Sequence, residues 1–444
     1  MSRQRIGKSR GRVFYAQELL AAIGRWLPHR GLPLQVEDGR VRWTPRLLVT
    51  MAILFAWLPG QAAKDIFATA RDAVVGMYPS RKRPGAGCSG FFAARAKLSD
   101  ALLATVRAAL QAGVKEVAGP TWRFLGWVLL GADGTRVEAP MTRANERAFG
   151  CAGKRKTTPQ LALTMLFHVG TGLPWVWRRG GGKESERKHV RKLIAALPRK
   201  TLLLADAGFT GYVLLRRLLR AGHDFIVRVG SNVTLLRELG FDVEELGNNI
   251  VYVWPQSHRR CQPLALRLVT VGRGRKKVCL LSSVLEESVL CDAQIAELYR
   301  LRWGIEVLYR SFKRTMEHHK MRSDSPEHAL VELDWALVGF WMLGLMSRQA
   351  LGPSRRQARR WSVAEALRVV RQAVQQPRQQ RRGGPLQKKL RAAVIDLYNR
   401  RRPKQARHWP HKKTEKPPGA PIIRMATRKE ILAAQGFEPL IASG

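Results

Sequence analysis

Hydrophobic positions recur at helical spacing through the N-terminal part of the chain. Apolar side chains stand three or four positions apart in 16–27, 47–57 and 97–117, which predicts three helices. Ser99 precedes the first apolar turn of the last segment, where an N-cap residue is expected. We therefore expect a helical region over residues 1–120.

The spacing changes at Thr121, where alternating and continuous apolar runs replace the helical pattern. Residues 124–140 predict two strands joined by an Asp133-Gly134 hairpin turn. Strand-like runs then alternate with amphipathic helical segments, the strands at 161–169, 171–179, 200–206 and 224–230 and the helices at 185–198 and 212–222. This alternation predicts a mixed α/β core.

Short strand-like runs separated by turns fill residues 231–285 and predict a β-rich insertion. A long helix is expected from Ala293 to His318, and an apolar helix follows it. The mixed-sheet core is thus expected in two parts, 121–230 and 286–347, followed by a basic C-terminal region over 348–444. The expected fold class is α/β, with helical N- and C-terminal regions.

The apolar stretches 47–58 and 335–346 are each about 12 residues long, shorter than the ~20 residues needed to cross a bilayer. Both therefore predict buried core helices and no membrane partner. The basic start of the chain leads into no apolar segment typical of a secretory signal. The five cysteines form no C-x-x-C pair, which disfavours a disulfide framework or a cysteine-based zinc site. We expect a cytoplasmic protein.

The net charge of the chain favours a polyanionic partner. The chain has 78 Lys and Arg against 33 Asp and Glu, a formal net charge of +45 that attracts polyanions. A hydrophobic content of 45% is too high for a disordered basic tail, so a packed core and a basic surface are both expected. Lys154, Arg155, Lys156 and the stretch 378–416 are candidate contacts to a DNA backbone. Simple solvated charge is the alternative for each of these residues.

Acidic residues are scarce, so an acid that ends an apolar strand is a candidate for chemistry. Asp133 and Asp206 both stand in that position. Each also has a structural explanation: Asp133-Gly134 is a common turn pair, and Asp206 could cap the following helix.

A third candidate site lies on the long helix. Tyr299, Arg302, Glu306 and Lys313 project at about 0°, −60°, −20° and −40°, within one stripe of a regular α-helix. The alternative is a solvated face on which Glu306 pairs with Arg302 and Arg310. Three converging carboxylates would repel one another unless cations lay between them, and oxygen ligands suit Mg²⁺ or Mn²⁺. Two such ions can clamp the attacking and leaving oxygens of a phosphoryl transfer.

The spacing Tyr-x2-Arg-x3-Glu-x6-Lys resembles the YREK signature of DDE-type transposases encoded by bacterial insertion sequences, specifically insertion sequence family four. All four signature residues are present as Tyr299, Arg302, Glu306 and Lys313. The segments GADGT and LLLADAGF resemble the family's surroundings of the first and second acids. The resemblance covers residues from about Trp122 to Arg322.

The resemblance implies an RNase H-like catalytic core interrupted by the β-rich insertion. Asp133, Asp206 and Glu306 would be the catalytic and metal-binding residues, with two Mg²⁺ ions that Mn²⁺ could replace. Tyr299, Arg302, Lys313 and Arg228 would contact DNA near the scissile phosphate. Some relatives carry a stacking Trp on the strand where this chain has Val278. Trp254 or Trp303 are the candidates to replace it, with packing as the alternative.

The implied activity is cut-and-paste transposition of an insertion sequence: metal-dependent endonuclease cleavage at its ends, then strand transfer. Double-stranded DNA, as inverted-repeat ends and as target, would be the partner of a homodimer in a synaptic complex near the bacterial nucleoid. Residues 1–120 would recognise the ends, and residues 348–444 would contact DNA or a second protomer. The alternatives are a non-catalytic basic nucleic-acid-binding protein and an inactive remnant of a transposable element.

Overall fold

The structure is a computed structural model that describes residues 14–28, 42–58, 60, 62–78, 84–95, 97–151, 157–272, 277–352, 361–379, 384–395 and 419–442. The chain divides into two compact units, and each consists of two separate segments. Unit 1 comprises 1–117 and 311–395, and unit 2 comprises 118–310 and 396–444. Lys154, Arg155, Lys156 and most of the basic stretch 378–416 lie outside the described residues.

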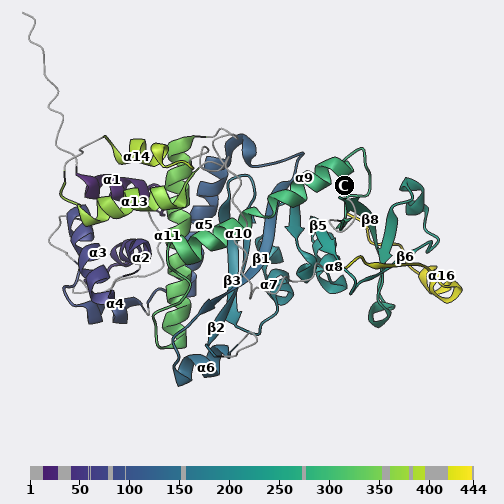
Figure 1. The fold of residues 1–444 in the computed structure, drawn as a ribbon, viewed down its shortest axis with the longest axis horizontal. Helices are drawn as coiled ribbons and strands as arrows, with labels where there is room; N and C mark the ends of the chain where they lie inside the picture. Colours follow the sequence, from purple (N-terminus) through teal and green to yellow (C-terminus); the bar gives the residue numbers. More distant parts are fainter. Residues whose placement is uncertain are drawn as a thin grey trace, which may run out of the picture. The chain divides into compact units, whose positions relative to one another are not determined.

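Unit 1 is helical in its described part (Figure 1). Its helices are α1 (Tyr15–Gly24), α2 (Pro45–Trp57), α3 (Ala63–Met77), α4 (Cys88–Arg95), α5 (Asp100–Ala118, whose last residue falls in unit 2), α11 (Pro326–Leu351), α13 (Val363–Gln375) and α14 (Leu386–Ala392). The hydroxyl of Ser99 accepts a hydrogen bond from the Leu102 amide at 3.2 Å, as an N-cap residue does.

Helix α11 is the core helix of unit 1. Trp57 Nε1 of α2 donates to the Gly339 carbonyl of α11 at 2.8 Å, so the two helices pack closely. A Cβ at position 339 would lie 2.6 Å from the Ala56 Cβ, a distance that only glycine avoids. Among the described residues, α11 alone is long and apolar enough to cross a membrane by length and composition. However, 83% of its apolar window is buried inside the protein, as in a core helix.

Unit 2 is built on one ten-stranded sheet in the order β10-β6-β7-β8-β9-β5-β4-β1-β2-β3. The strands are β1 (Val128–Glu138), β2 (Gln160–His168), β3 (Leu173–Gly181), β4 (Thr201–Ala205), β5 (Asp224–Val229), β6 (Thr234–Arg237), β7 (Ile250–Val253), β8 (Leu264–Val271), β9 (Val278–Ser282) and β10 (Ile422–Met425). Strands β1, β2 and β3 are antiparallel neighbours, whereas β4 and β5 continue from β1 in parallel. This 3-2-1-4-5 arrangement is the RNase H-like fold.

The predicted hairpin at Asp133-Gly134 is wrong. Strand β1 runs unbroken through both residues, and Asp133 pairs with Met165 while Gly134 pairs with Thr164 on β2. Gly134 is not among the described residues with positive φ, which the usual two-residue hairpin turns require. The long pairing with β2 holds this segment extended in spite of its turn-like residues.

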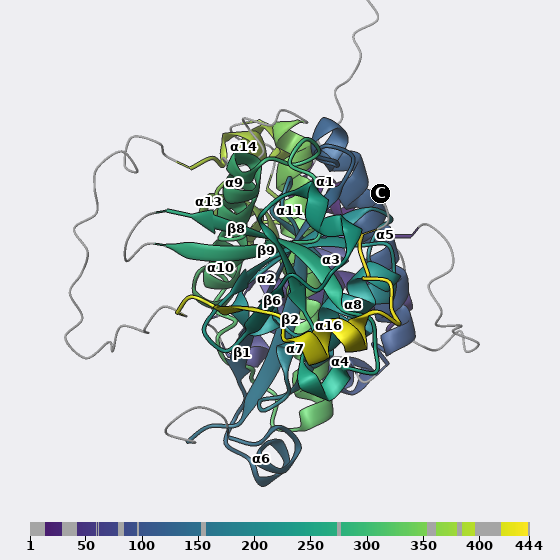
Figure 2. The ribbon, with the colours of Figure 1, turned by 90° about the vertical axis from the view of Figure 1, so that its right-hand side faces the viewer.

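The segment 231–285 continues the core sheet instead of forming a separate layer. Strand β9 pairs antiparallel with β5, and β8, β7 and β6 follow in turn. The C-terminal strand β10 then pairs in parallel with β6. Together with α16 (Arg428–Ala434), it forms the yellow end of the sheet in Figures 1 and 2.

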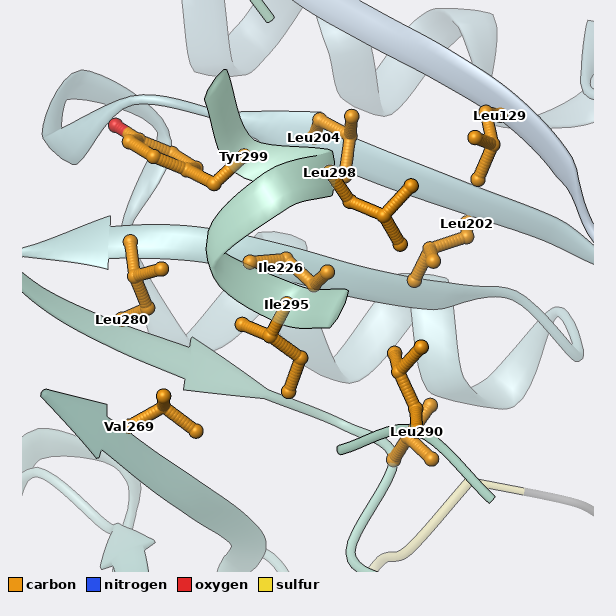
Figure 3. Packing of buried hydrophobic residues seen from close by; sticks show 11 residues of the cluster. Leu129, Leu202, Leu204, Ile226, Val269, Leu280, Leu290, Ile295, Leu298 and Tyr299 are labelled. Carbon is orange, nitrogen blue, oxygen red and sulfur yellow. The ribbon is translucent and has the colours of Figure 1, made fainter. Parts of the chain in front are cut away.

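Helices cover the two faces of the sheet. Helix α9 (Asp292–Leu301) packs on one face, where its apolar residues join those of β1, β4, β5, β8 and β9 (Figure 3). This cluster comprises Leu129, Leu202, Leu204, Ile226, Val269, Leu280, Val284, Leu290, Ile295, Leu298 and Tyr299. Helix α7 (Glu186–Leu193) packs against β2 and β3, and α8 (Tyr212–Arg220) packs against α7 and β5.

The single helix predicted from Ala293 to His318 is also wrong. Helix α9 ends at Leu301, α10 spans Gly304–Arg310, and Ser311–Thr315 form a π-helical turn. The amides of Arg302 and Trp303 bond to carbonyls only three residues back, which tightens the chain between α9 and α10. The Met316 amide instead bonds to the carbonyl of Ser311, five residues back. The 100° step assumed for one α-helix therefore does not apply from Tyr299 to Lys313.

Candidate active site

Asp133 and Asp206 lie at the end of β4. Strand β1 pairs with β4 only from Val128 to Gly131, so Asp133 lies beyond the paired part of β1. Strand β4 ends at Ala205, and Asp206 follows it directly. Side chains alternate between the two faces along a strand, so Asp133 lies on the same face as Leu129, the face that α9 covers.

Burial and neighbouring charges act on the Asp133 carboxyl. Burial is the main cause that raises its pKa to about 7, and the charge of Asp206 adds to that rise. The Gly134 amide, which donates to Asp133 Oδ1 at 2.8 Å, lowers the pKa by a smaller amount. Asp206 Oδ1 accepts from the Gly208 amide at 2.9 Å and caps the short 3₁₀ turn Ala207–Phe209. Asp206 is thus an N-cap and a neighbour of Asp133 at once.

Helix α10 is joined to β1 beside Asp133. The ring of Phe167 on β2 lies against two glycines, because a Cβ would come within 2.0 Å of it at Gly131 and within 3.1 Å at Gly304. The Tyr309 hydroxyl donates to the backbone carbonyl of Asp133 at 2.8 Å. These contacts hold the helix that carries Glu306 over the face of the sheet that carries Asp133.

The Glu306 carboxylate is affected by two arginines and by one of the aspartates. Burial raises its pKa, Arg302 and Arg310 lower it, and Asp206 raises it again. Its carboxylate Oε1 lies 3.6 Å from Arg302 Nη2, and its side chain is 37% exposed. The Glu306 carboxylate therefore lies near enough to Asp206 to be affected by its charge while it pairs with Arg302.

Tyr299 and Arg302 are buried, which argues against the alternative of a solvated face for these two residues. Tyr299 is 9% exposed and Arg302 6% exposed. The Arg302 guanidinium lies over the Tyr299 ring, 5.6 Å from its centroid. Burial raises the pKa of Tyr299, the charges of Arg302 and Arg228 lower it, and Asp206 raises it. Arg228 of β5 therefore belongs to the same neighbourhood.

Lys313 lies in the π-helical turn Ser311–Thr315 and belongs to unit 1, whereas Tyr299, Arg302 and Glu306 belong to unit 2.

The two tryptophans considered for stacking differ in their exposure to solvent. Trp254 is buried, and its Nε1 donates to the Cys261 carbonyl at 2.7 Å, so it is a packing residue. Trp303 is 57% exposed and adjoins Arg302.

Sequence reasoning missed Glu186, the first residue of α7. Its charge contributes to the raised pKa of Asp133. Burial raises the pKa of Glu186 itself, the charge of Asp206 raises it further, and Arg136 lowers it. An acid in the first turn of a helix is ordinary because it favours the helix dipole, so its position carries no signal. Only the folded structure, in which the Glu186 carboxylate lies against Gly134 and near Gly208, shows that it is close to this part of the sheet.

The donor chemistry of the site fits a hard divalent cation. Carboxylate oxygens from β1, the end of β4 and α10 are the ligands that Mg²⁺ and Mn²⁺ prefer. In the part of the chain that the structure describes, however, no three His, Cys, Asp or Glu residues are grouped closely enough to hold one ion.

The RNase H-like sheet thus carries one acid on its first strand and one directly after its fourth. Residues 129–339 match the transposase DDE domain family. Residues 129–339 therefore resemble a DDE-type transposase domain.

Three known proteins are similar to this chain. Transposase InsG of insertion sequence element IS4 from Escherichia coli K12 is 29% identical over 235 residues, 50% of this chain and 52% of that protein. A transposase assigned to element IS4SA of Synechocystis is 20% identical over 184 residues, 40% of this chain and 51% of that protein. The chain thus matches about half the length of each relative. A piggyBac transposase, solved as a synaptic complex with hairpin DNA, has a TM-score of 0.38 at 14% identity, covering 91% of this chain and 86% of that one.

Proposed function

We propose that this chain is a transposase that cuts DNA at the ends of its insertion sequence and joins the freed 3′ ends to target DNA. The observation that carries this proposal is the position of Asp133 and Asp206 together at the end of β4, with α10 holding Glu306 over the same face. The family match of residues 129–339 and the net charge of +45 support the same conclusion.

Asp133, Asp206 and Glu306 would hold divalent cations, two Mg²⁺ ions or Mn²⁺ in their place. When bound, these ions supply Lewis-acid stabilisation of the attacking and leaving oxygens of an in-line phosphoryl transfer. The chain itself supplies a rigid frame, because two of the acids project from the sheet and the third from a helix held by Phe167 and Tyr309. Glu306 would exchange its pairing with Arg302 for a cation.

Cationic side chains around the acids would hold the DNA backbone. Arg302 and Arg228 are near Tyr299, and release of Arg302 from Glu306 would free a bidentate donor for a phosphate. Lys313 and the segment Lys154–Lys156 are further candidates for backbone contacts. The Tyr299 ring, buried under the Arg302 guanidinium, would position that arginine instead of contacting DNA directly.

Double-stranded DNA is the proposed partner, as inverted-repeat ends and as target, bound by a homodimer in the bacterial cytoplasm. The test is cleavage of DNA that carries the terminal repeats flanking this gene, with Mg²⁺, by the wild type and by Asp133→Ala, Asp206→Ala and Glu306→Gln. Each of the three variants should abolish cleavage while keeping end binding.

Glu138→Gln is the matched control, because this acid is exposed on the same strand as Asp133. It should cleave as the wild type does. Undiminished cleavage by any of the three variants would refute the proposed site. DNA binding without cleavage, unaffected by metal or by the three substitutions, would instead identify a basic binding protein or an inactive remnant.

A further inference from the structure

We propose that a basic groove on unit 2 binds the backbone phosphates of the DNA strand that passes over Asp206, a proposal that rests on the proposed function. The groove has a volume of about 830 Å³. Its lining comes from α7, the start of α8, β6, the end of β7, β10 and α16. Among the described residues, no cation considered above for DNA contact lines it, so it is a separate candidate site.

The groove begins close to the end of β4. Asp206 follows that strand and caps the 3₁₀ turn Ala207–Phe209, and the next residue, Thr210, belongs to the lining of the groove. Arg187 Nη1 of α7 donates to the Thr210 carbonyl at 3.1 Å. A Cβ at Gly211 would lie 3.0 Å from the same Nη1, so glycine at this position leaves room for the guanidinium. The groove therefore adjoins the place where the proposed function requires the DNA strand to be cut.

The lining of the groove carries an excess of positive charge. Among its described residues, Arg187, Arg259, Arg424 and Lys429 are basic, and Glu430 alone is acidic. Glu430 accepts hydrogen bonds from Arg424 at 2.7 Å on both of its oxygens, and its Oε1 also lies 2.5 Å from Arg259 Nη2. One carboxylate thus compensates the charge of only one of these two arginines, and the lining has a net charge of +3. A groove lined by one sign of charge attracts ligands of the opposite sign.

One of these cations is held in a fixed position. The Arg259 guanidinium lies over the ring of Trp254, 4.3 Å from its centroid. Trp254 is itself buried and donates to the Cys261 carbonyl at 2.7 Å. A planar guanidinium fixed in this way suits a phosphate, because it loses little freedom when it binds. Arg187 and Lys429 are exposed, and they come from two different elements of the lining, α7 and α16.

The arrangement of the cations favours a strand of DNA over a small phosphate compound. Arg187 bonds to the backbone beside α8, whereas Arg259 and Arg424 meet at Glu430 on α16. The positive charge is therefore divided between two parts of the groove. A DNA strand presents one negative charge per ~3.4 Å of its length, so successive phosphates can reach both parts.

The test is filter binding of DNA that carries the terminal repeats to the full chain, without Mg²⁺ and over a range of salt concentrations. Arg187→Ala and Lys429→Ala should each reduce the slope of log affinity against log salt by about 0.9, and the double variant by about 1.8. Arg187→Lys keeps the charge and should retain the wild-type slope, which separates a lost contact from a misfolded variant. Arg199→Ala is the matched control and should also bind as the wild type does. Arg199 is exposed and precedes the start of β4, at the end of that strand opposite to Asp206.

The outcomes separate this proposal from the function on which it rests. Wild-type slopes in both single variants and in the double variant, with cleavage still abolished by Asp133→Ala, would overturn the groove alone. Reduced slopes in the groove variants, with no cleavage by the wild type in Mg²⁺, would support the groove and overturn the proposed function. Adenosine triphosphate should compete with DNA only weakly. If it displaces DNA from the wild type but not from the double variant, the groove is a site for a small phosphate compound and the proposal is wrong.

Discussion

Gly131→Ala should destabilise unit 2 through a clash with one ring. Gly131 on β1 stands directly opposite Phe167 on β2, and a Cβ there would lie 2.0 Å from Phe167 Cε1 and 2.9 Å from Cδ1 and Cζ. Phe167 is 1% exposed, and its other edge already lies against Gly304, so the ring has no free space to move into. The methyl group must therefore displace either the strand or α10.

Overpacking of this kind costs about 1–3 kcal/mol. For a unit of this size, each kcal/mol lowers the melting temperature by roughly 2–4 °C. Thermal unfolding followed by circular dichroism should thus show a loss of roughly 2–12 °C for Gly131→Ala. Since the strand carries Asp133 and α10 carries Glu306, Mg²⁺-dependent cleavage should fall whichever of the two is displaced.

Phe167→Leu is the compensating change, because it removes the atoms that the new methyl group would meet. The double variant should lose less stability than the two single variants lose in sum, with a coupling free energy of about 1 kcal/mol or more. Gly436→Ala in the same unit is the control, since a Cβ there meets nothing within 4 Å. A Gly131→Ala protein that melts within 1 °C of the wild type would contradict the packing described for Phe167.

Three further predictions concern stability and DNA. Two hydrogen bonds from Arg424 are the largest cause that lowers the pKa of Glu430 to about 2. The pairing therefore stabilises unit 2 fully above pH 4.5, the ordinary pKa of a glutamate, and this stabilisation is lost as the pH falls from 4.5 towards 2. Glu430→Gln should remove that acid-dependent loss, measured by urea unfolding across this range; an unchanged profile would contradict the pairing. Lys313→Ala should weaken end binding and reduce the slope of log affinity against log salt by about one, if this lysine contacts a phosphate; an unaltered slope in filter binding excludes that contact. Trp303→Ala should change the melting temperature by no more than about 1 °C, because the ring of Trp303 is exposed. The same variant should reduce excision if the ring stacks on DNA bases. Excision at the wild-type level would show that Trp303 has no such role.

Much of the fold is predictable from the sequence because burial leaves a periodic signature. The strands β2 to β5 and the helices α7 and α8 fall where alternation and helical spacing place them. The long pairing of β1 with β2 could not be predicted in the same way. Asp133-Gly134 has the local character of a turn, and only the partner strand keeps it extended.

The candidate site is predictable in its residue types but not in its geometry. Asp133 and Asp206 are candidates because each ends an apolar run, and Glu306 is a candidate because of its helical spacing. That spacing assumes a continuous helix, whereas the chain tightens at Arg302 and forms a π-helical turn after Arg310. Glu186 carries no spacing signal at all, because its relation to β1 depends on Gly134, which has no side chain where the Glu186 carboxylate lies. Features of this kind arise from tertiary packing, which no local pattern encodes.

The discontinuous composition of unit 1 has a consequence for synthesis on the ribosome. Helix α2, apolar on nearly every side, emerges more than 200 residues before α11, the helix against which it packs. At about 5–20 residues per second, this interval of about 270 residues lasts roughly 13–54 s. Throughout it, the nascent N-terminal helices expose surface that chaperones recognise, so the yield of active protein depends on holding them until α11 arrives.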